Sequence, residues 1–291
     1  MLDRRRRCSG EPTAPVDHVA FGDISRDGLG TDTDMDPSQV PVLGVPEPPE
    51  VADLRRLSAD IVRLLAERAS DRHRGLRPIV GSAAIAQELT RLEPMAAKSI
   101  RVLQPQYGYD PEDPGVPLTR LACSRGVEFE LITRPATVAT HPLLSSIFPG
   151  TLLGPCFLRA VVIDESAALV GGVDDADGNR VTWFTEASAL VEAVTDLWLA
   201  TVPQCEPILG PGEKPPLTER QLDVAGLICL GEKDDAIARA VSVSLRTAER
   251  EVAAVLAALD ARSRAEAVLM MRGRRINSAE AVRGPSRRRG R

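Results

Sequence analysis

The sequence has few of the features that build metal sites, disulfide frameworks or membrane spans. Its five cysteines are scattered and never form a Cys-x-x-Cys pair, so neither a zinc site nor a set of structural disulfides is indicated. No apolar run approaches the roughly 18 residues of a membrane helix. No hydrophobic region follows the N-terminal arginines, as it would in a signal peptide. We therefore expect a cytoplasmic protein with no metal or other cofactor and no membrane partner.

Charge is unevenly distributed along the chain. The net charge is −5, yet residues 217–291 hold fifteen Arg and Lys against ten Asp and Glu. This C-terminal part therefore carries +5 and the part before it −10. Parts of opposite charge indicate that the basic one contacts a polyanion.

With 291 residues, 43% of them hydrophobic, the chain is long enough for two domains. Residues 1–50 are rich in Pro, Gly and Asp without periodicity, which predicts disorder. Residues 51–74 predict a helical segment. Its apolar residues are spaced like a and d positions of a coiled coil: Leu54, Leu57, Ile61 and Leu64. Two heptads leave both a dimer seam and packing against the next domain open.

Between residues 77 and 208 helical and strand patterns alternate, which predicts an α/β domain. The predicted helices cover residues 82–97, 117–126 and 188–202. The predicted strands cover residues 99–105, 127–133, 157–164, 167–173 and 181–185, with the last of these as the final strand. Prolines and glycines in residues 203–216 predict an interdomain linker centred on 209–214.

Residues 215–279 predict an all-α module of four helices, followed by a basic tail at 280–291. Thr218 and Gln221 predict a capping box at the start of the first helix, and Gly231 predicts the end of that helix. Ser263 with Glu266 predicts a second capping box before the last helix. A bundle this small usually needs a partner, either a subunit or a nucleic acid.

The module has five short motifs at fixed spacing: Leu217 to Arg220, Gly231, Ile237-Ala238, Ser244 to Thr247, and Arg264 to Val268. With these motifs, matched without a gap, the module resembles the LuxR-type helix-turn-helix domains of bacterial transcription regulators. The resemblance implies binding to double-stranded DNA as a homodimer. The chain departs from the family pattern at four positions: Ser242, where Gly is favoured; Ala248, usually Val; Glu249, often basic; and Glu251, usually His.

The arrangement of residues around the second helix of this motif predicts which face contacts DNA. At about 100° per residue, one sector holds the residues expected to face the core: Ala248, Val252, Val255, Leu256 and Leu259. Arg246, Arg250 and Ala257 point away from that sector, with Thr247, Ala253 and Ala254 beside them. The predicted DNA contacts are Ser244, Arg246, Thr247, Arg250 and Ala254. Glu249 and Glu251 are expected on the two flanks, against the phosphates.

Residues 157–172 resemble the phospholipase-D-type signature His-x-Lys-x-x-x-x-Asp followed by an apolar strand. Phe157 stands at the His position, Arg159 at the Lys position, and Asp164 is kept. Without an imidazole no phosphohistidine can form, and His18, His73 and His141 lack the companion spacing. The resemblance implies a degenerate, TrmB-like sensor or dimerisation domain at 77–208 that is not an enzyme. A plain hairpin with Asp164 at its turn is the simpler interpretation.

Two other sensor types fit less well. A phosphoacceptor receiver needs acids after its first strand and a lysine after its fifth, but the first predicted strand ends without an acid and Lys98 is the segment's one lysine. An acyl-homoserine-lactone pocket would need aromatic residues at a spacing that Tyr107, Tyr109, Trp183 and Trp198 do not have.

Taken together, the sequence predicts a sequence-specific DNA-binding transcriptional regulator with an unidentified small-molecule or protein effector. A homodimer is expected through the Leu54–Leu64 helix or through the last helix around Val268 and Leu269. Two alternatives stay open. One is a phosphodiesterase with a DNA-targeting tail, and the other is an interaction protein whose Glu249 and Glu251 prevent DNA binding.

Overall fold

The computed structural model describes residues 47–70 and 75–273. The prediction of disorder for residues 1–50 was wrong for residues 49 and 50, because a helix, Pro49–Ser70, begins there. Residues 1–46 of that prediction and the basic tail at 280–291 lie outside the described ranges. No helix within the described ranges is both long and apolar enough to cross a membrane.

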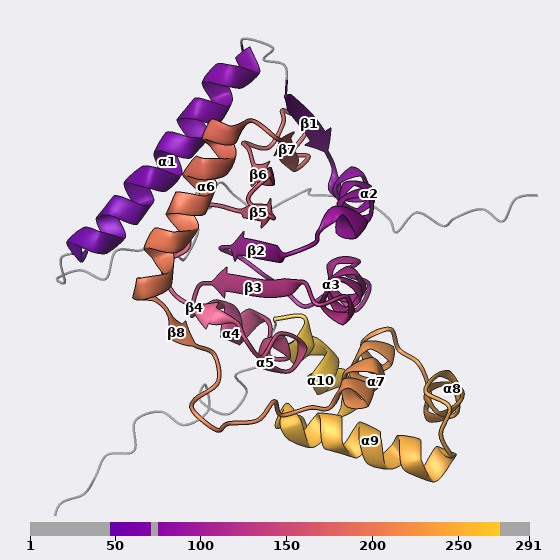
Figure 1. Cartoon of the computed structure of the whole chain (residues 1–291). Helices are drawn as coiled ribbons and strands as arrows, with labels where there is room; N and C mark the ends of the chain where they lie inside the picture. Colours follow the sequence, from indigo (N-terminus) through magenta and orange to yellow (C-terminus); the bar gives the residue numbers. More distant parts are fainter. Residues whose placement is uncertain (1–46, 71–74, 274–291) are drawn as a thin grey trace, which may run out of the picture. The chain divides into compact units, whose positions relative to one another are not determined.

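The first part of the described chain is a mixed α/β domain built on one eight-stranded sheet (Figure 1). Its strands are β1 Leu76–Val80, β2 Ser99–Gln104, β3 Glu128–Thr133, β4 Leu152–Leu153, β5 Ala160–Ile163, β6 Ala167–Gly171, β7 Val181–Thr185 and β8 Glu206–Pro207. Their order is β1-β7-β6-β5-β2-β3-β4-β8. Among the described strands, the β2–β3 and β3–β4 pairs are parallel and the other five pairs are antiparallel.

Helices cover both faces of the sheet. They are α1 Pro49–Ser70, α2 Ser82–Leu92, α3 Gly115–Ser124, α4 Thr137–Thr140, α5 Leu144–Ile147 and α6 Ser188–Thr201, with 3₁₀ turns η2 Glu93–Met95 and η3 Val202–Gln204. Helices α1 and α6 lie side by side on one face, and α2 and α3 lie against the other (Figure 1). The central strands alternate accordingly: on β5, Val162 faces α6, whereas Val161 and Ile163 face α2 and α3.

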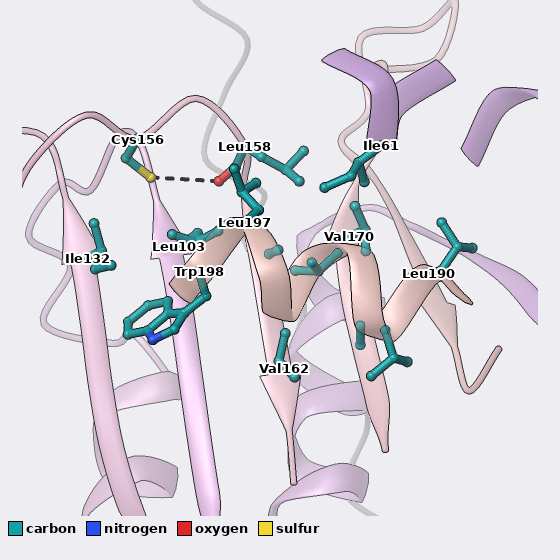
Figure 2. Close-up of a cluster of buried hydrophobic side chains, with 14 of the residues drawn as sticks. Ile61, Leu103, Ile132, Cys156, Leu158, Val162, Val170, Leu190, Leu197 and Trp198 are labelled. Carbon is teal, nitrogen blue, oxygen red and sulfur yellow. Dashed lines mark hydrogen bonds between the residues drawn. The ribbon is translucent and has the colours of Figure 1, made fainter. Parts of the chain in front are cut away.

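The larger core lies between the sheet and the α1–α6 pair. Figure 2 shows Trp198 and Leu197 of α6 against Leu103, Ile132, Val162 and Val170, which come from four different strands. Trp198 is 2% exposed. A buried indole of this size contributes much of the apolar surface that joins α6 to the sheet.

The packing of helix α1 distinguishes the two interpretations of its apolar spacing, a dimer seam and packing against the next domain. Leu54, Ser58, Ile61 and Leu65 are buried against the α/β domain, a spacing of three to four residues that follows the 3.6-residue period of a straight helix. Leu57, predicted as part of the same stripe, is 43% exposed. The dimer-seam interpretation was therefore wrong for Leu54 and Ile61, because α6 of the same chain already covers them.

The strand predictions were incomplete at the edges of the sheet. The predicted final strand, now β7, is followed by β8, which lies in the predicted linker and pairs with β4. Strand β1 pairs with β7 along five residues and was also missed. Strands β4 and β8 have only two paired residues each, too few for an alternating pattern, and Pro207 is a residue type confined to edge strands.

The C-terminal part consists of four helices: α7 Glu219–Cys229, α8 Asp234–Ala240, α9 Leu245–Ala258 and α10 Arg264–Met271. The first capping box is confirmed, with the backbone N–H of Gln221 donating to the Thr218 hydroxyl and the side-chain oxygen of Gln221 accepting from the backbone N–H of Thr218. Gly231 follows the end of α7 with a φ of 85°, a conformation that favours glycine.

The second capping box is only half present. Ser263 accepts the N–H of Glu266 as predicted, but the Glu266 carboxylate accepts from Arg262 N–H, one residue earlier than a capping box requires. The helix still begins at the predicted residue, because the Ser263 hydroxyl satisfies a free N–H of the first turn.

Candidate functional site

Helices α8 and α9 are joined by a tight turn. Ser242, in this turn, has a φ of 55°. This is the left-handed region of backbone conformation, which favours glycine. The turn is closed by the N–H of Val243 donating to the Ala238 carbonyl at 2.9 Å. Ser244 then caps α9 by accepting the N–H of Thr247. A short helix, a tight turn and a longer capped helix form a helix-turn-helix (Figure 1).

The inward face of α9 lies as predicted. Ala248 and Val255 are fully buried, Val252 and Leu259 nearly so, and Leu256 is half-buried. They share one core with residues of α7, α8 and α10. The rotation of α9 about its axis is therefore set by this packing.

The outward face of α9, defined here as Arg246, Arg250, Ala253 and Ala257, is exposed. The Arg250 side chain is 71% exposed. Thr247 and Ala254 are half-buried beside this face. Two arginines above a floor of alanines allow close approach to a nucleic acid, and a guanidinium pairs bidentately with guanine in the major groove.

Ser244 differs from the other predicted DNA contacts in the role of its side chain. It lies at the N-terminal end of the outward face and is exposed, but its hydroxyl is already bonded to the N–H and the hydroxyl of Thr247. Its first role is to begin α9.

Glu251 does not lie where the sequence predicted. It is 4% exposed. Its carboxylate accepts from the Gln221 amide at 2.9 Å and from Arg250 at 3.1 Å, and it lies 3.5 Å from the Arg220 guanidinium. The prediction of a flank against phosphate was wrong because α7 packs along that side of α9 and covers it. Glu249 stays exposed.

The partners of Glu251 connect two helices and one side chain of the outward face of α9. Gln221 and Arg220 belong to α7, whereas Arg250 lies on the outward face of α9. The hydrogen bonds from Gln221 and then Arg250 lower the pKa of the Glu251 carboxyl, against the opposing effect of burial. We infer that Glu251 orients Arg250 and joins α7 to α9. Sequence analysis found Gln221 only as a cap, because its second contact is 30 residues away.

Glu251→Ala is expected to lower the free energy of unfolding by about 1–2 kcal/mol at pH 7, because it leaves the Gln221 amide unpaired and removes partly exposed ion pairs. The pKa of Glu251 is lowered in the folded state, so its stabilisation is complete above the ordinary value of 4.5 and is lost as the pH falls further. Urea unfolding at several pH values tests this.

Glu249→Ala is the matched control, since Glu249 is exposed on the same helix. It should change the stability by less than about 0.5 kcal/mol. Equal losses in both variants would contradict the structural role of Glu251.

The α/β domain contacts the helical module through α7. Leu143 lies in the core that contains α7, the Tyr109 hydroxyl approaches Gly226, and Arg120 lies 3.6 Å from Glu219. The N–H of Leu217 donates to the Ser146 hydroxyl at 3.1 Å. Arg246 and Arg250 take part in none of these contacts.

The residues that match the phospholipase-D-type signature are spread over both ends of β5. Asp164 lies at the β5–β6 turn, where its carboxylate accepts the N–H groups of Ala97, Lys98 and Ser99 at 2.8 Å each. Burial raises the pKa of Asp164, yet these three donors, Ser99 foremost, hold it below its usual value. Asp164 thus anchors a hairpin turn to β2, in line with the simpler of the two interpretations.

At the other end of β5, Phe157 stacks under the Arg55 guanidinium, 4.1 Å from its ring centroid. Arg159 lies beside Gly171 of β6. The structure therefore brings neither Phe157 nor Arg159 to Asp164.

His141 is the one histidine among the described residues. It is 2% exposed and lies between Tyr107 and Tyr109, with ring centroids 5.1 and 5.4 Å away. Burial lowers its pKa to about 4, so the ring is neutral at pH 7. It directly follows α4 and has the surroundings of a packed side chain.

No family model matches the sequence, and no curated protein sequence matches it significantly. Among solved structures, Nuc from Salmonella typhimurium, a phospholipase D family member, aligns over 45% of this chain and 96% of its own, at 12% identity and a TM-score of 0.36. TrmBL2, an archaeal chromatin protein with a novel mode of DNA binding, aligns over 54% and 64%, at 12% identity and a TM-score of 0.38. A Vibrio cholera VqmA–ligand–DNA complex aligns over 40% and 50%, at 17% identity and a TM-score of 0.19. At these identities and TM-scores we infer nothing about function from the similarities.

Proposed function

We propose that the protein is a sequence-specific DNA-binding transcriptional regulator with a LuxR-type helix-turn-helix. In this proposal α9 enters the major groove and the α/β domain senses an effector without catalysing a reaction. The observation that carries the proposal is the exposed outward face of α9, with Arg246 and Arg250 on a helix whose opposite face is fully packed. A helix-turn-helix reads bases with its second helix in this way.

A homodimer is part of the proposal, because such modules read two half-sites and the symmetry of the operator mirrors that of the protein. Since α1 packs within its own chain, the last helix is the surface we assign to the dimer. In this last helix, α10, the side chains of Val268 and Leu269 are half-buried.

The proposal is tested by incubating the full-length protein with fragmented bacterial genomic DNA and sequencing the bound fraction. The parent protein should enrich a recurring motif, and the double variant Arg246→Ala, Arg250→Ala should not. A parent protein that enriches no fragment at low salt would favour the interaction-protein alternative instead.

Glu249→Lys should tighten binding to all DNA sequences and steepen the dependence of affinity on salt. The exposed Glu249 lies on the flank of α9 that remains free, so a lysine there neutralises about one more phosphate, which adds roughly 0.9 to the slope of log affinity against log salt. Titrations of labelled duplexes at several salt concentrations measure that slope.

Glu192→Lys is the matched control, because it makes the same charge change at an exposed position of α6. If both variants steepen the slope equally, the effect comes from net charge and Glu249 does not lie at the DNA.

We also propose that the protein has no phosphodiesterase activity, because Phe157 cannot act as a nucleophile and Asp164 is engaged by three backbone N–H groups. Incubation with bis(p-nitrophenyl) phosphate should release no nitrophenolate. Turnover that persists in the presence of a chelator and disappears in Arg159→Gln would promote the phosphodiesterase alternative.

A further inference from the structure

The α/β domain contains a cavity between its sheet and the helices α2 and α3. Its volume is about 470 Å³, within the roughly 300–1,000 Å³ of small-molecule sites. Its walls are mostly apolar. They include Leu89 of α2, Ile100, Val102, Phe129 and Leu131 of the central strands, and Phe148, which follows α5. An open apolar space of this size against a sheet suits the body of a small organic molecule.

Two arginines line the same cavity. Arg159 precedes β5 and is half-buried, and Arg180 precedes β7 and is exposed. Among the described residues neither guanidinium forms an ion pair or a side-chain hydrogen bond. Burial first, and then the nearby positive charge of Arg180, lower the pKa of Arg159, and Asp174 offsets this only in part. Two like charges near each other at an apolar cavity are unfavourable unless an anion joins them.

The carboxylates that line the cavity are already engaged. Asp113 accepts from the Tyr107 hydroxyl and from Gly115 N–H. Asp110 accepts the N–H of Glu112, and Glu93 pairs with Arg125. Each of these carboxylates therefore accepts at least one hydrogen bond within the protein, whereas among the described residues the side chains of Arg159 and Arg180 donate none.

We propose that this cavity binds a small organic anion with an apolar body. The acidic group lies at Arg159 and Arg180, and the hydrocarbon or aromatic part packs against the apolar walls. The first turn of α2 holds no acidic residue, and its first residue, Ser82, lines the cavity. The positive end of the helix dipole therefore adds to the attraction.

One loop connects the cavity with the helical module. Gly108 and Asp110 line the cavity, whereas Tyr109, between them, approaches Gly226 of α7. A ligand that moves this loop would change the support of α7. This regulatory step rests on the proposed function in DNA binding, but the binding of the anion does not.

The test uses two fluorescent probes of similar shape, 8-anilinonaphthalene-1-sulfonate and N-phenyl-1-naphthylamine, which lacks the sulfonate. Each is titrated into the full-length protein and followed by fluorescence. The parent should bind the sulfonate at least about tenfold more tightly than the neutral probe, since a hydrogen bond to a charged group is worth this much or more. Arg159→Met should reduce that preference, because only Arg180 then remains to pair with the sulfonate, and it should leave the binding of the neutral probe unaffected.

Two further variants make the result specific to the cavity. Arg63→Met removes an exposed arginine of α1 whose ion-pair partner within the described residues is Asp60, and it should change the affinity for neither probe. Ala86→Phe, on the α2 wall of the cavity, should weaken both probes while thermal unfolding stays close to that of the parent.

Equal affinity for both probes in the parent, or unchanged sulfonate binding in Arg159→Met or Ala86→Phe, would overturn the proposal. If the Ala86→Phe variant does not fold, Leu89→Trp replaces it, and this variant should likewise weaken the binding of both probes. If the protein binds the sulfonate through Arg159 but binds no DNA, the proposed function fails and this inference stands.

Discussion

Trp198→Ala should lower the free energy of unfolding by about 3–5 kcal/mol, the usual cost of removing a buried tryptophan side chain. Trp198 is 2% exposed and belongs to the core that α6 shares with residues of four strands (Figure 2). The cavity left behind cannot collapse easily, because strands β2, β3, β5 and β6 are held in place by their hydrogen-bonded neighbours. Urea unfolding of the full chain, followed by circular dichroism, measures the loss.

Leu199→Ala is the control for this change. Leu199 is the next residue of α6 and is 55% exposed, so its truncation should cost no more than about 0.5 kcal/mol. Similar losses for Trp198→Ala and Leu199→Ala would mean that α6 does not pack on the sheet through the face described.

Arg250→Ala should weaken binding to a specific DNA site by about 1–3 kcal/mol and relax the preference at one base position. The arginine is on the outward face of α9, and its guanidinium is held at 3.1 Å by the Glu251 carboxylate. A guanidinium that is oriented before binding loses less freedom when it pairs with a base. The measurement is a set of titrations with duplexes that differ at single base pairs.

Arg220→Ala separates base contact from a loss of support, because Arg220 is the other guanidinium near Glu251 but lies on α7. It should leave the base preference unchanged. If Arg250→Ala leaves affinity and preference unaltered, the outward face has been assigned to the wrong residues.

Much of the helical module could be predicted from the sequence because its signals are local. Thr218, Gly231 and Ser263 mark the helix ends by side-chain caps and a positive φ, each within a few residues of the boundary. The buried positions of α9 follow from the helix period alone. Glu251 could not be placed in this way, because its burial depends on which side of α9 is covered by α7.

The α/β domain was predicted less completely for the same reason. Helices α2, α3 and α6 and the central strands have enough residues to show their period, whereas β4 and β8 have two each. The order of strands and the cavity at Arg159 and Arg180 depend on contacts between distant segments, so no local pattern predicts them. The apolar spacing of α1 is the same for a dimer seam and for packing within the chain, and only the position of α6 beside α1 separates the two.

The most direct test of DNA reading by α9 is a titration of the parent protein against one labelled duplex that carries the enriched motif and one with the same bases shuffled. Both are measured at about 50 and about 200 mM salt. We expect the motif to be bound at least roughly a thousandfold more tightly than the shuffled duplex, and we expect the preference to persist when higher salt weakens both complexes. Equal affinity for the two duplexes, or no binding to either at the lower salt, would contradict the account.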